Sequence, residues 1–202
     1  MAYFSATGTT KGVAEKLASA VGGDLYEIVP AEPYTSADLN YSDSSTRATR
    51  EQNDKSARPA IASETLDLGG YDTIYVGYPI WWGEEPRILD TFMESYDFSG
   101  KTMIPFCTSG SSGIGSSGRN MEQLTGGATW LDGSRFGGSV SEDALRAWAD
   151  ELRAEAERYV GDEDGTVTIE DTELTWGAFK TMLSVNDLRQ LCRDRGGRFQ
   201  PL

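Results

Sequence analysis

The stretch Tyr3-Phe4-Ser5-Ala6-Thr7-Gly8-Thr9-Thr10 decides the fold of this chain. A short apolar run ends there at hydroxyl residues around one glycine. An amphipathic segment follows, whose apolar residues recur at helical spacing: Val13, Ala14, Leu17, Ala18 and Val21. This order predicts a strand, a tight loop and a helix. Such a loop offers backbone N–H groups and the positive end of a helix dipole to an anion. The stretch therefore predicts a phosphate site, with a plain helix cap as the alternative.

The kind of phosphate follows from the absence of basic residues in this loop. Triphosphate loops of the GxxxxGK[ST] type place a lysine against the β- and γ-phosphates, and Lys11 lies outside that pattern. Hydroxyl and amide groups without a lysine suit a single terminal phosphate. The loop therefore favours a mononucleotide.

Strand-like and helix-like segments alternate along the rest of the chain. After the first strand and helix, we expect strands at 24–29, 73–79, 102–108 and 129–131, with short helices at 46–54 and 119–124. A helix is expected at 84–96, with Pro86 in its first turn. The last helix begins after the capping residue Ser141 and has an apolar stripe of Leu145, Trp148, Leu152, Ala156 and Tyr159. The pattern predicts an α/β fold with a doubly wound, five-stranded parallel sheet.

The chain divides into residues 1–160, which hold this pattern, and a C-terminal extension at 161–202. The extension begins with a polar hinge at 161–165, followed by a strand-like segment at 166–170 and a helix-like segment at 185–193. No motif in the extension indicates what its role is.

Composition limits the function classes. The chain has 202 residues, a formal net charge of −14 and no histidine. Imidazole acid–base catalysis and His-ligated metal sites are therefore excluded, and we expect no metal site. Nucleic acid and anionic membranes are poor partners, because they are bound by an excess of Lys and Arg. We expect the acidic surface to dock onto basic faces of partner proteins instead.

The two cysteines, Cys107 and Cys192, have neither metal-site nor disulfide-framework spacing, which indicates a reducing compartment. The sequence shows no signal peptide and no apolar run of membrane-spanning length, so we expect a cytoplasmic location. Because almost no residues precede Tyr3, a trimmed N-terminus and a removed export signal are both alternatives that the sequence leaves open.

Three loops are expected to meet beyond the strand ends, namely 5–10, 79–85 and 108–118. The second contains Trp81 and Trp82, two adjacent large rings that are costly to expose. They either pack under the following helix or form an aromatic surface for a ring system. The phosphate loop two strands away favours the aromatic surface.

The third loop is rich in glycine and serine, and it contains a GxGxxG pattern at Gly113, Gly115 and Gly118, with Asp132 near the spacing of a ribose-binding acid. A dinucleotide site needs the glycines directly after the strand and at the start of a full crossover helix. Extra residues intervene here and the following helix is short, so we reject a dinucleotide site.

Together, the motifs YFSATGTT, YPIWWGEEP and TSGSSGIG resemble the three FMN-contacting loops of a flavodoxin, more narrowly one with a YPIWWG segment after the third strand. The resemblance covers residues 1–160. It implies a 2-1-3-4-5 sheet, non-covalent FMN and one- or two-electron redox work. The residues it implies at the phosphate are Ser5, Ala6, Thr7, Gly8, Thr9 and Thr10; those flanking the ring are Pro79, Ile80, Trp81, Trp82 and Gly83, with Thr108, Ser109, Gly110, Ser111, Gly113, Ile114 and Gly115 on its other side.

Some residues have a functional and a structural interpretation. A peptide beside Gly83 could turn to accept a hydrogen bond from N5–H of reduced flavin, or Gly83 is an ordinary turn residue. Cys107 is read as a core residue rather than a redox thiol. Glu84 and Glu85 either favour the start of a helix or, if they face the flavin, lower its reduction potential.

Three functions are open from the sequence. The favoured one is an electron carrier between redox partner proteins. The second is an NAD(P)H-dependent FMN reductase acting on quinones or similar acceptors. The third is a flavin-free interaction domain that docks through 185–193.

Overall fold

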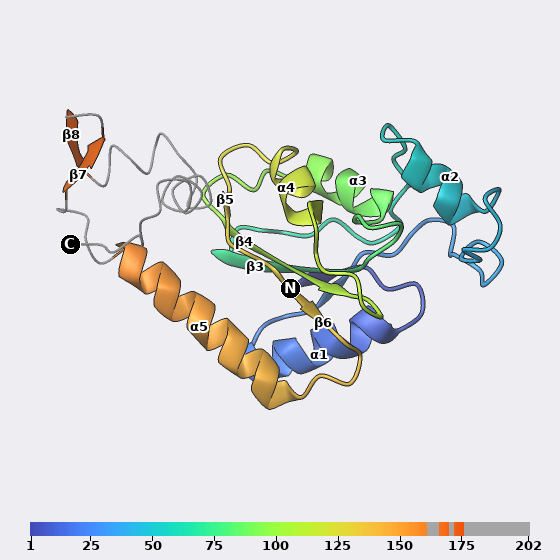
Figure 1. Cartoon of the computed structure of the whole chain (residues 1–202), viewed down its shortest axis with the longest axis horizontal. Helices are drawn as coiled ribbons and strands as arrows, with labels where there is room; N and C mark the ends of the chain where they lie inside the picture. The colour runs from blue at the N-terminus through green and yellow to red at the C-terminus, as the bar shows by residue number, and fades with distance from the viewer. Residues whose placement is uncertain (161–165, 170–171, 176–202) are drawn as a thin grey trace.

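A parallel sheet lies between two layers of helices in the computed structural model, which describes residues 1–160, 166–169 and 172–175 (Figure 1). The strand order is β2-β1-β3-β4-β5. The five strands are β1 (Ala2–Tyr3), β2 (Tyr26–Glu27), β3 (Thr73–Pro79), β4 (Thr102–Thr108) and β5 (Thr129–Trp130). The predicted doubly wound α/β fold with a 2-1-3-4-5 sheet is thereby confirmed.

Helices cover both faces of the sheet. One face carries α1 (Thr9–Val21) and α5 (Glu142–Val160), and the other carries α3 (Arg87–Ser95) and α4 (Ser117–Glu122), while α2 (Arg47–Asn53) lies at the edge (Figure 1). Apolar side chains of α1 and α5 pack with Phe106 in one core cluster. This arrangement leaves the carboxyl ends of the central strands open to ligands.

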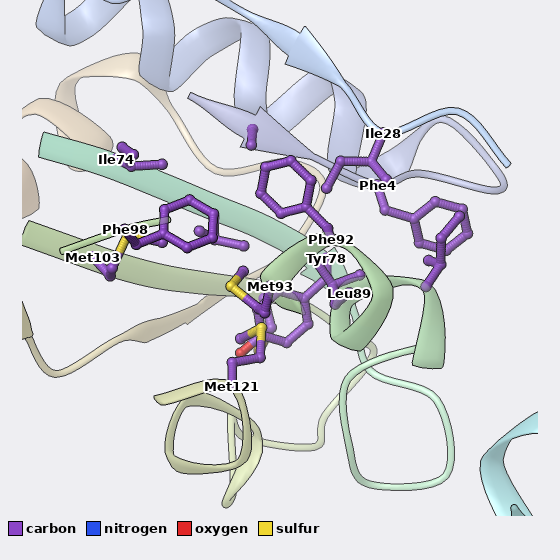
Figure 2. Packing of buried hydrophobic residues seen from close by; sticks show 14 of the residues in the cluster. Phe4, Ile28, Ile74, Tyr78, Leu89, Phe92, Met93, Phe98, Met103 and Met121 are labelled. Atoms are coloured by element: carbon purple, nitrogen blue, oxygen red, sulfur yellow. The ribbon is translucent and has the colours of Figure 1, made fainter. Parts of the chain in front are cut away.

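The larger core lies under α3. Figure 2 shows Tyr78 and Met103 from the sheet facing Phe92 and Met93 of α3 and Met121 of α4. All five side chains are fully buried. The Tyr78 hydroxyl also shares a buried hydrogen bond of 2.7 Å with the Ser117 hydroxyl, which fixes α4 to the sheet.

The first strand holds the predicted phosphate loop in place although it is only two residues long. Ala2, Tyr3 and Phe4 are each at most 3% exposed. β1 pairs with β2 on one side and with β3 on the other. The Phe4 N–H extends this pairing by donating to the Gly77 carbonyl at 2.9 Å. Burial and pairing on both sides compensate for the shortness of the strand.

The fifth strand position is broken in two, which the sequence did not predict. β6 (Ser134–Phe136) pairs with Phe106–Thr108 of β4, beyond the pairing of β5 with the start of the same strand. Gly133 lies in the break. A Cβ there would be 2.3 Å from the Pro105 carbonyl oxygen, so only glycine allows this close approach.

Several helices and strands begin or end at other residues than the sequence predicted. The strand expected at 24–29 is only Tyr26–Glu27, and the helix expected at 84–96 begins at Arg87, after Pro86. The reason for the second shift is that Glu85 precedes a proline, which disfavours helical backbone there. The Ser141 cap is confirmed, since its hydroxyl accepts from the Ala144 N–H at 3.2 Å.

The C-terminal extension contributes two described strands, β7 (Thr166–Ile169) and β8 (Thr172–Thr175), which pair antiparallel. The expected strand at 166–170 is therefore present up to residue 169. The expected hinge at 161–165 and helix at 185–193 lie outside the described residues, as do the side chains at 156 and 159. Among the helices that the structure describes, none is both long and apolar enough to cross a membrane.

Candidate functional site

The N-terminus of α1 is open to an anion. Its N-cap residue, Gly8, has φ +86°, no side chain caps the helix, and the first turn holds no acidic residue. The first-turn N–H groups of a helix have no acceptor within it. The Gly8 N–H itself is occupied, because it donates to the Ser5 hydroxyl at 3.1 Å. No acidic residue of that turn therefore compensates the positive end of the helix.

Thr10 is a buried residue in the first turn of α1. Its hydroxyl shares a buried hydrogen bond of 2.8 Å with the Thr108 hydroxyl at the end of β4. This contact joins the loop after β1 to the loop after β4. The contact therefore joins two parts of the site, and the predicted contact of Thr10 with a phosphate stays a prediction.

A hollow of about 480 Å³ lies beside this helix end. It is lined by residues from five loop regions, and none of the described lining residues is charged: Thr7, Thr9, Leu39, Tyr41, Pro79, Ile80, Trp81, Thr108, Ser109, Gly110 and Gly138. The three loops expected to converge at the strand ends thus do so. The loop after β6 adds Gly138, and the long loop before α2 adds Leu39 and Tyr41.

The two tryptophans have different environments. Trp81 is 4% exposed, and its ring contacts Tyr34 and Phe4 with centroid distances of 4.9 and 5.5 Å. Trp82 is 52% exposed. The interpretation in which both rings pack in the core is therefore wrong. Trp82 is the exposed ring, and the buried Trp81 is the tryptophan that lines the hollow.

A tight turn presents Trp82. The backbones of Trp81 and Glu84 exchange two hydrogen bonds, of 3.0 and 3.1 Å. Between them Trp82 has φ +50° and Gly83 has φ +84°. Positive φ is unstrained for glycine and costly for a bulky residue. The surroundings of the turn must therefore hold Trp82 in this conformation.

Tyr41 is the second exposed ring of the site. It is 50% exposed, and its ring centroid lies 5.4 Å from that of Trp82. Sequence reasoning missed Tyr41 and Leu39 because their loop between β2 and α2 is polar and without a motif. An aromatic residue within a polar loop was the one available signal.

Behind the tryptophan turn lies a buried cluster of charged and amide side chains. Gln52 donates to the carbonyls of Trp81 and Glu85, at 3.1 Å each, and so holds the base of the turn. The Arg87 guanidinium contacts three carboxylates: Glu84 at 2.5 Å, Glu85 at 3.2 Å and Asp90 at 3.4 Å.

Glu85 is fully buried and accepts from the Asn120 amide at 3.1 Å. Burial raises the pKa of Glu85 to about 7, and the neighbouring Asp90 charge adds to the rise. Glu84 is held by Arg87 and Lys55, and those hydrogen bonds and charges lower its pKa. Neither carboxylate lines the hollow, and neither is in α3. Both glutamates bind Arg87 in the first turn of α3, and their predicted effects on the helix start and on a flavin stay predictions.

Cys107 is a core residue, as predicted. It is fully buried in β4, and burial raises the pKa of its thiol to about 12. A thiol of this kind stays protonated at neutral pH and is inert.

The remaining predicted residues lie around the hollow without lining it. Ser111 and Gly113 are exposed in the third loop, and Ile114 and Gly115 line a separate hollow of about 630 Å³ beside α4. The rejected dinucleotide motif stays rejected, because α4 spans only six residues. No cluster of three potential metal-ligating acids or cysteines occurs within the described part of the chain.

The sequence model of the flavodoxin family matches residues 1–152. This chain is a member of the flavodoxin family. Its similarity to solved structures agrees with that assignment. A protein of Bacteroides eggerthii described as a flavoprotein is 49% identical, with 75% of this chain and 95% of that chain covered and a TM-score of 0.71.

Two further solved structures extend the comparison. A flavoprotein of Bacteroides uniformis is 46% identical over 74% of this flavodoxin and 95% of its own chain, with a TM-score of 0.70. A flavoprotein of Lactobacillus acidophilus, solved in complex with FMN, is 21% identical over 73% and 95% of the two chains, with a TM-score of 0.56, and shows the shared fold. The comparison with curated proteins gives no match.

Proposed function

We propose that the hollow of this flavodoxin binds FMN, with the phosphate at the N-terminus of α1 and the ring beside Trp82 and Tyr41. One observation above all supports this proposal: Thr7 and Thr9 at an uncapped helix N-terminus and the exposed Tyr41 line one hollow of about 480 Å³, and the exposed Trp82 ring lies 5.4 Å from the Tyr41 ring. A hollow of that size is typical of small-molecule sites.

The donor set suits a phosphate monoester. The hydroxyls of Thr7 and Thr9 line the hollow, and the first turn of α1 leaves backbone N–H groups for an anion. Among the residues that the structure describes, no lysine or arginine lines the hollow, which suits one terminal phosphate better than a triphosphate.

The rim suits a flat conjugated ring. Trp82 and Tyr41 together offer two half-exposed aromatic surfaces, and Ser109 and Gly110 of the third loop line the same hollow as Tyr41. FMN supplies the redox chemistry when it is bound. The chain binds and orients the cofactor and sets the charge around it.

We infer from the family and from the net charge of −14 that the protein carries electrons between redox partners with basic docking faces. Gly83, whose φ of +84° glycine tolerates best, stays the residue at which a peptide could turn toward reduced flavin. A Gly83→Ala variant tests that hypothesis by the separation of the two one-electron potentials, and an unchanged separation contradicts it.

Flavin binding is tested by titrating the FMN-free protein with FMN and with riboflavin. We expect FMN to bind at least about tenfold more tightly, because hydrogen bonds to a charged phosphate contribute more than neutral ones. A Thr9→Val variant should lose affinity for FMN and keep its affinity for riboflavin. Thr65→Val, at an exposed position outside the hollow, is the matched control.

Each other outcome contradicts a defined part of the proposal. Equal affinity for FMN and riboflavin would contradict the phosphate position. Failure to bind either flavin would contradict the site itself and favour an interaction domain.

Electron carrying is tested by steady-state oxidation of NADPH with menadione as the acceptor. The isolated protein should turn over slowly, and added reductase of basic surface charge should speed the reaction, less so at high salt. Rapid turnover by the isolated protein would favour the NAD(P)H-dependent reductase instead.

A further inference from the structure

Arg135 makes the most extensive side-chain contact with the third loop. It lies in β6, opposite Cys107 of β4. Its Nη2 donates to the carbonyls of Ser109, at 2.6 Å, and Gly110, and its Nε donates to the Ser109 hydroxyl at 3.2 Å. The Ser109 hydroxyl in turn donates to the Ser112 carbonyl. One guanidinium therefore fixes the backbone of this loop.

These contacts determine where the loop N–H groups point. In a planar trans peptide, the carbonyl of one residue and the N–H of the next face opposite ways. Because the carbonyls of Ser109 and Gly110 point at Arg135, the N–H groups of Gly110 and Ser111 point away from it. Within the described residues, neither N–H group donates to a protein acceptor.

The loop residues that Arg135 binds also belong to the hollow. Ser109 and Gly110 line the hollow, and Arg135 does not. The loop thus offers two free donors to a ligand and carries a positive charge behind them. None of the described side chains that line the hollow is charged, and Arg135 holds a positive charge against two lining residues, Ser109 and Gly110.

We propose that Arg135 is a positioning residue for bound flavin, which turns the N–H groups of Gly110 and Ser111 toward acceptor atoms of the ring and stabilises the negative charge of reduced flavin. This rests on the FMN site proposed above. The charge acts because a cation near a group that becomes negative on reduction favours the reduced form. Arg135 therefore raises the reduction potential of the bound flavin.

Two variants separate the effect of the Arg135 charge from that of its hydrogen-bond geometry. Arg135→Met removes both the charge and the hydrogen bonds, and Arg135→Lys keeps the charge but cannot reproduce the planar fork. Arg146→Met is the control, since it removes the same charge from a half-exposed side chain on α5 that pairs with Glu142. The three variants are compared with the wild type in affinity for FMN and riboflavin and in the midpoint potential of bound FMN.

We expect Arg135→Met to bind both flavins about tenfold more weakly, as for the loss of a hydrogen bond to a charged group, and to have a lower midpoint potential. Arg135→Lys should lose affinity for both flavins while it keeps the wild-type potential. Arg146→Met should change neither quantity.

The outcomes separate this inference from the function it rests on. If the wild type binds FMN and both Arg135 variants keep its affinity and potential, the role of Arg135 is wrong and the FMN site stands. If Arg135→Met does not fold, a wild-type affinity in Arg135→Lys still overturns the positioning role, and a lowered potential overturns the role of charge. If the wild type binds no flavin, the proposed function itself fails.

Discussion

Glu85 gives this protein a pH-dependent stability that one substitution should remove. The carboxyl is fully buried, and burial raises its pKa from 4.5 to about 7. The groups that face it are Arg87, Asp90 and Asn120, with the Tyr78 hydroxyl behind them. A single guanidinium is shared with two other carboxylates, so ionised Glu85 lacks full compensation.

The sign follows from the direction of the shift. A raised pKa means that the folded protein holds its proton more tightly than the unfolded chain does. The contribution to stability is complete below pH 4.5 and is lost as the pH rises to about 7. The shift corresponds to about 3 kcal/mol of unfolding free energy, at 1.36 kcal/mol per pKa unit.

The substitution Glu85→Gln mimics the protonated carboxyl at every pH. We expect wild type and variant to have similar stability near about pH 5, and the variant to be more stable by about 3 kcal/mol near about pH 8. Urea unfolding of the flavin-free proteins at both pH values measures this difference. Glu151→Gln, at an exposed position of α5, is the control and should follow the wild type.

Parallel stability curves for wild type and Glu85→Gln would refute the reasoning. Carboxyls whose pKa is lowered, such as those of Glu84 and Glu94, titrate below the pH range over which Glu85 loses its proton. Asp90 has a raised pKa as well, but it is present in all three proteins.

Three further predictions follow from single contacts. The substitution Thr10→Val removes the buried hydroxyl pair with Thr108. It should lower the free energy of unfolding in urea by about 1–3 kcal/mol and weaken flavin binding. Unchanged flavin affinity would show that the contact does not position the site. Gly133→Ala should cost at least about 1–3 kcal/mol, because its Cβ would overlap the Pro105 carbonyl; a wild-type melting temperature would contradict the close approach. Cys107 should resist iodoacetamide in the native state, as read by peptide mass spectrometry, and rapid labelling would contradict its burial.

The sequence was most informative where a strand is buried on both faces. β3 and β4 have the predicted bounds, because a continuous apolar run between polar residues leaves few alternatives. β6 was missed, since Ser134, Arg135 and Phe136 form no pattern and become a strand only by pairing with β4. Local propensity cannot report such a tertiary contact.

The candidate site was also predicted only in part from the sequence. The convergence of three loops followed from strand order, which a sequence pattern can indicate. Which of two adjacent tryptophans is exposed depends on a turn with two positive φ angles, and no pattern distinguishes Trp81 from Trp82. Arg135, Tyr41 and Gln52 enter the site from segments without motifs, so their positions depend on packing of the whole chain.

The hydroxyl pair of Thr10 and Thr108 also bears on the order of events during synthesis. These residues are 98 positions apart, and Gly138 completes the lining of the hollow still later in the chain. On the ribosome, the phosphate loop therefore emerges long before its partners exist. Because domains form as their residues emerge from the N-terminus, a nascent chain that ends before β6 should be unable to capture the cofactor. On the proposed site, flavin binding would thus mark a finished sheet.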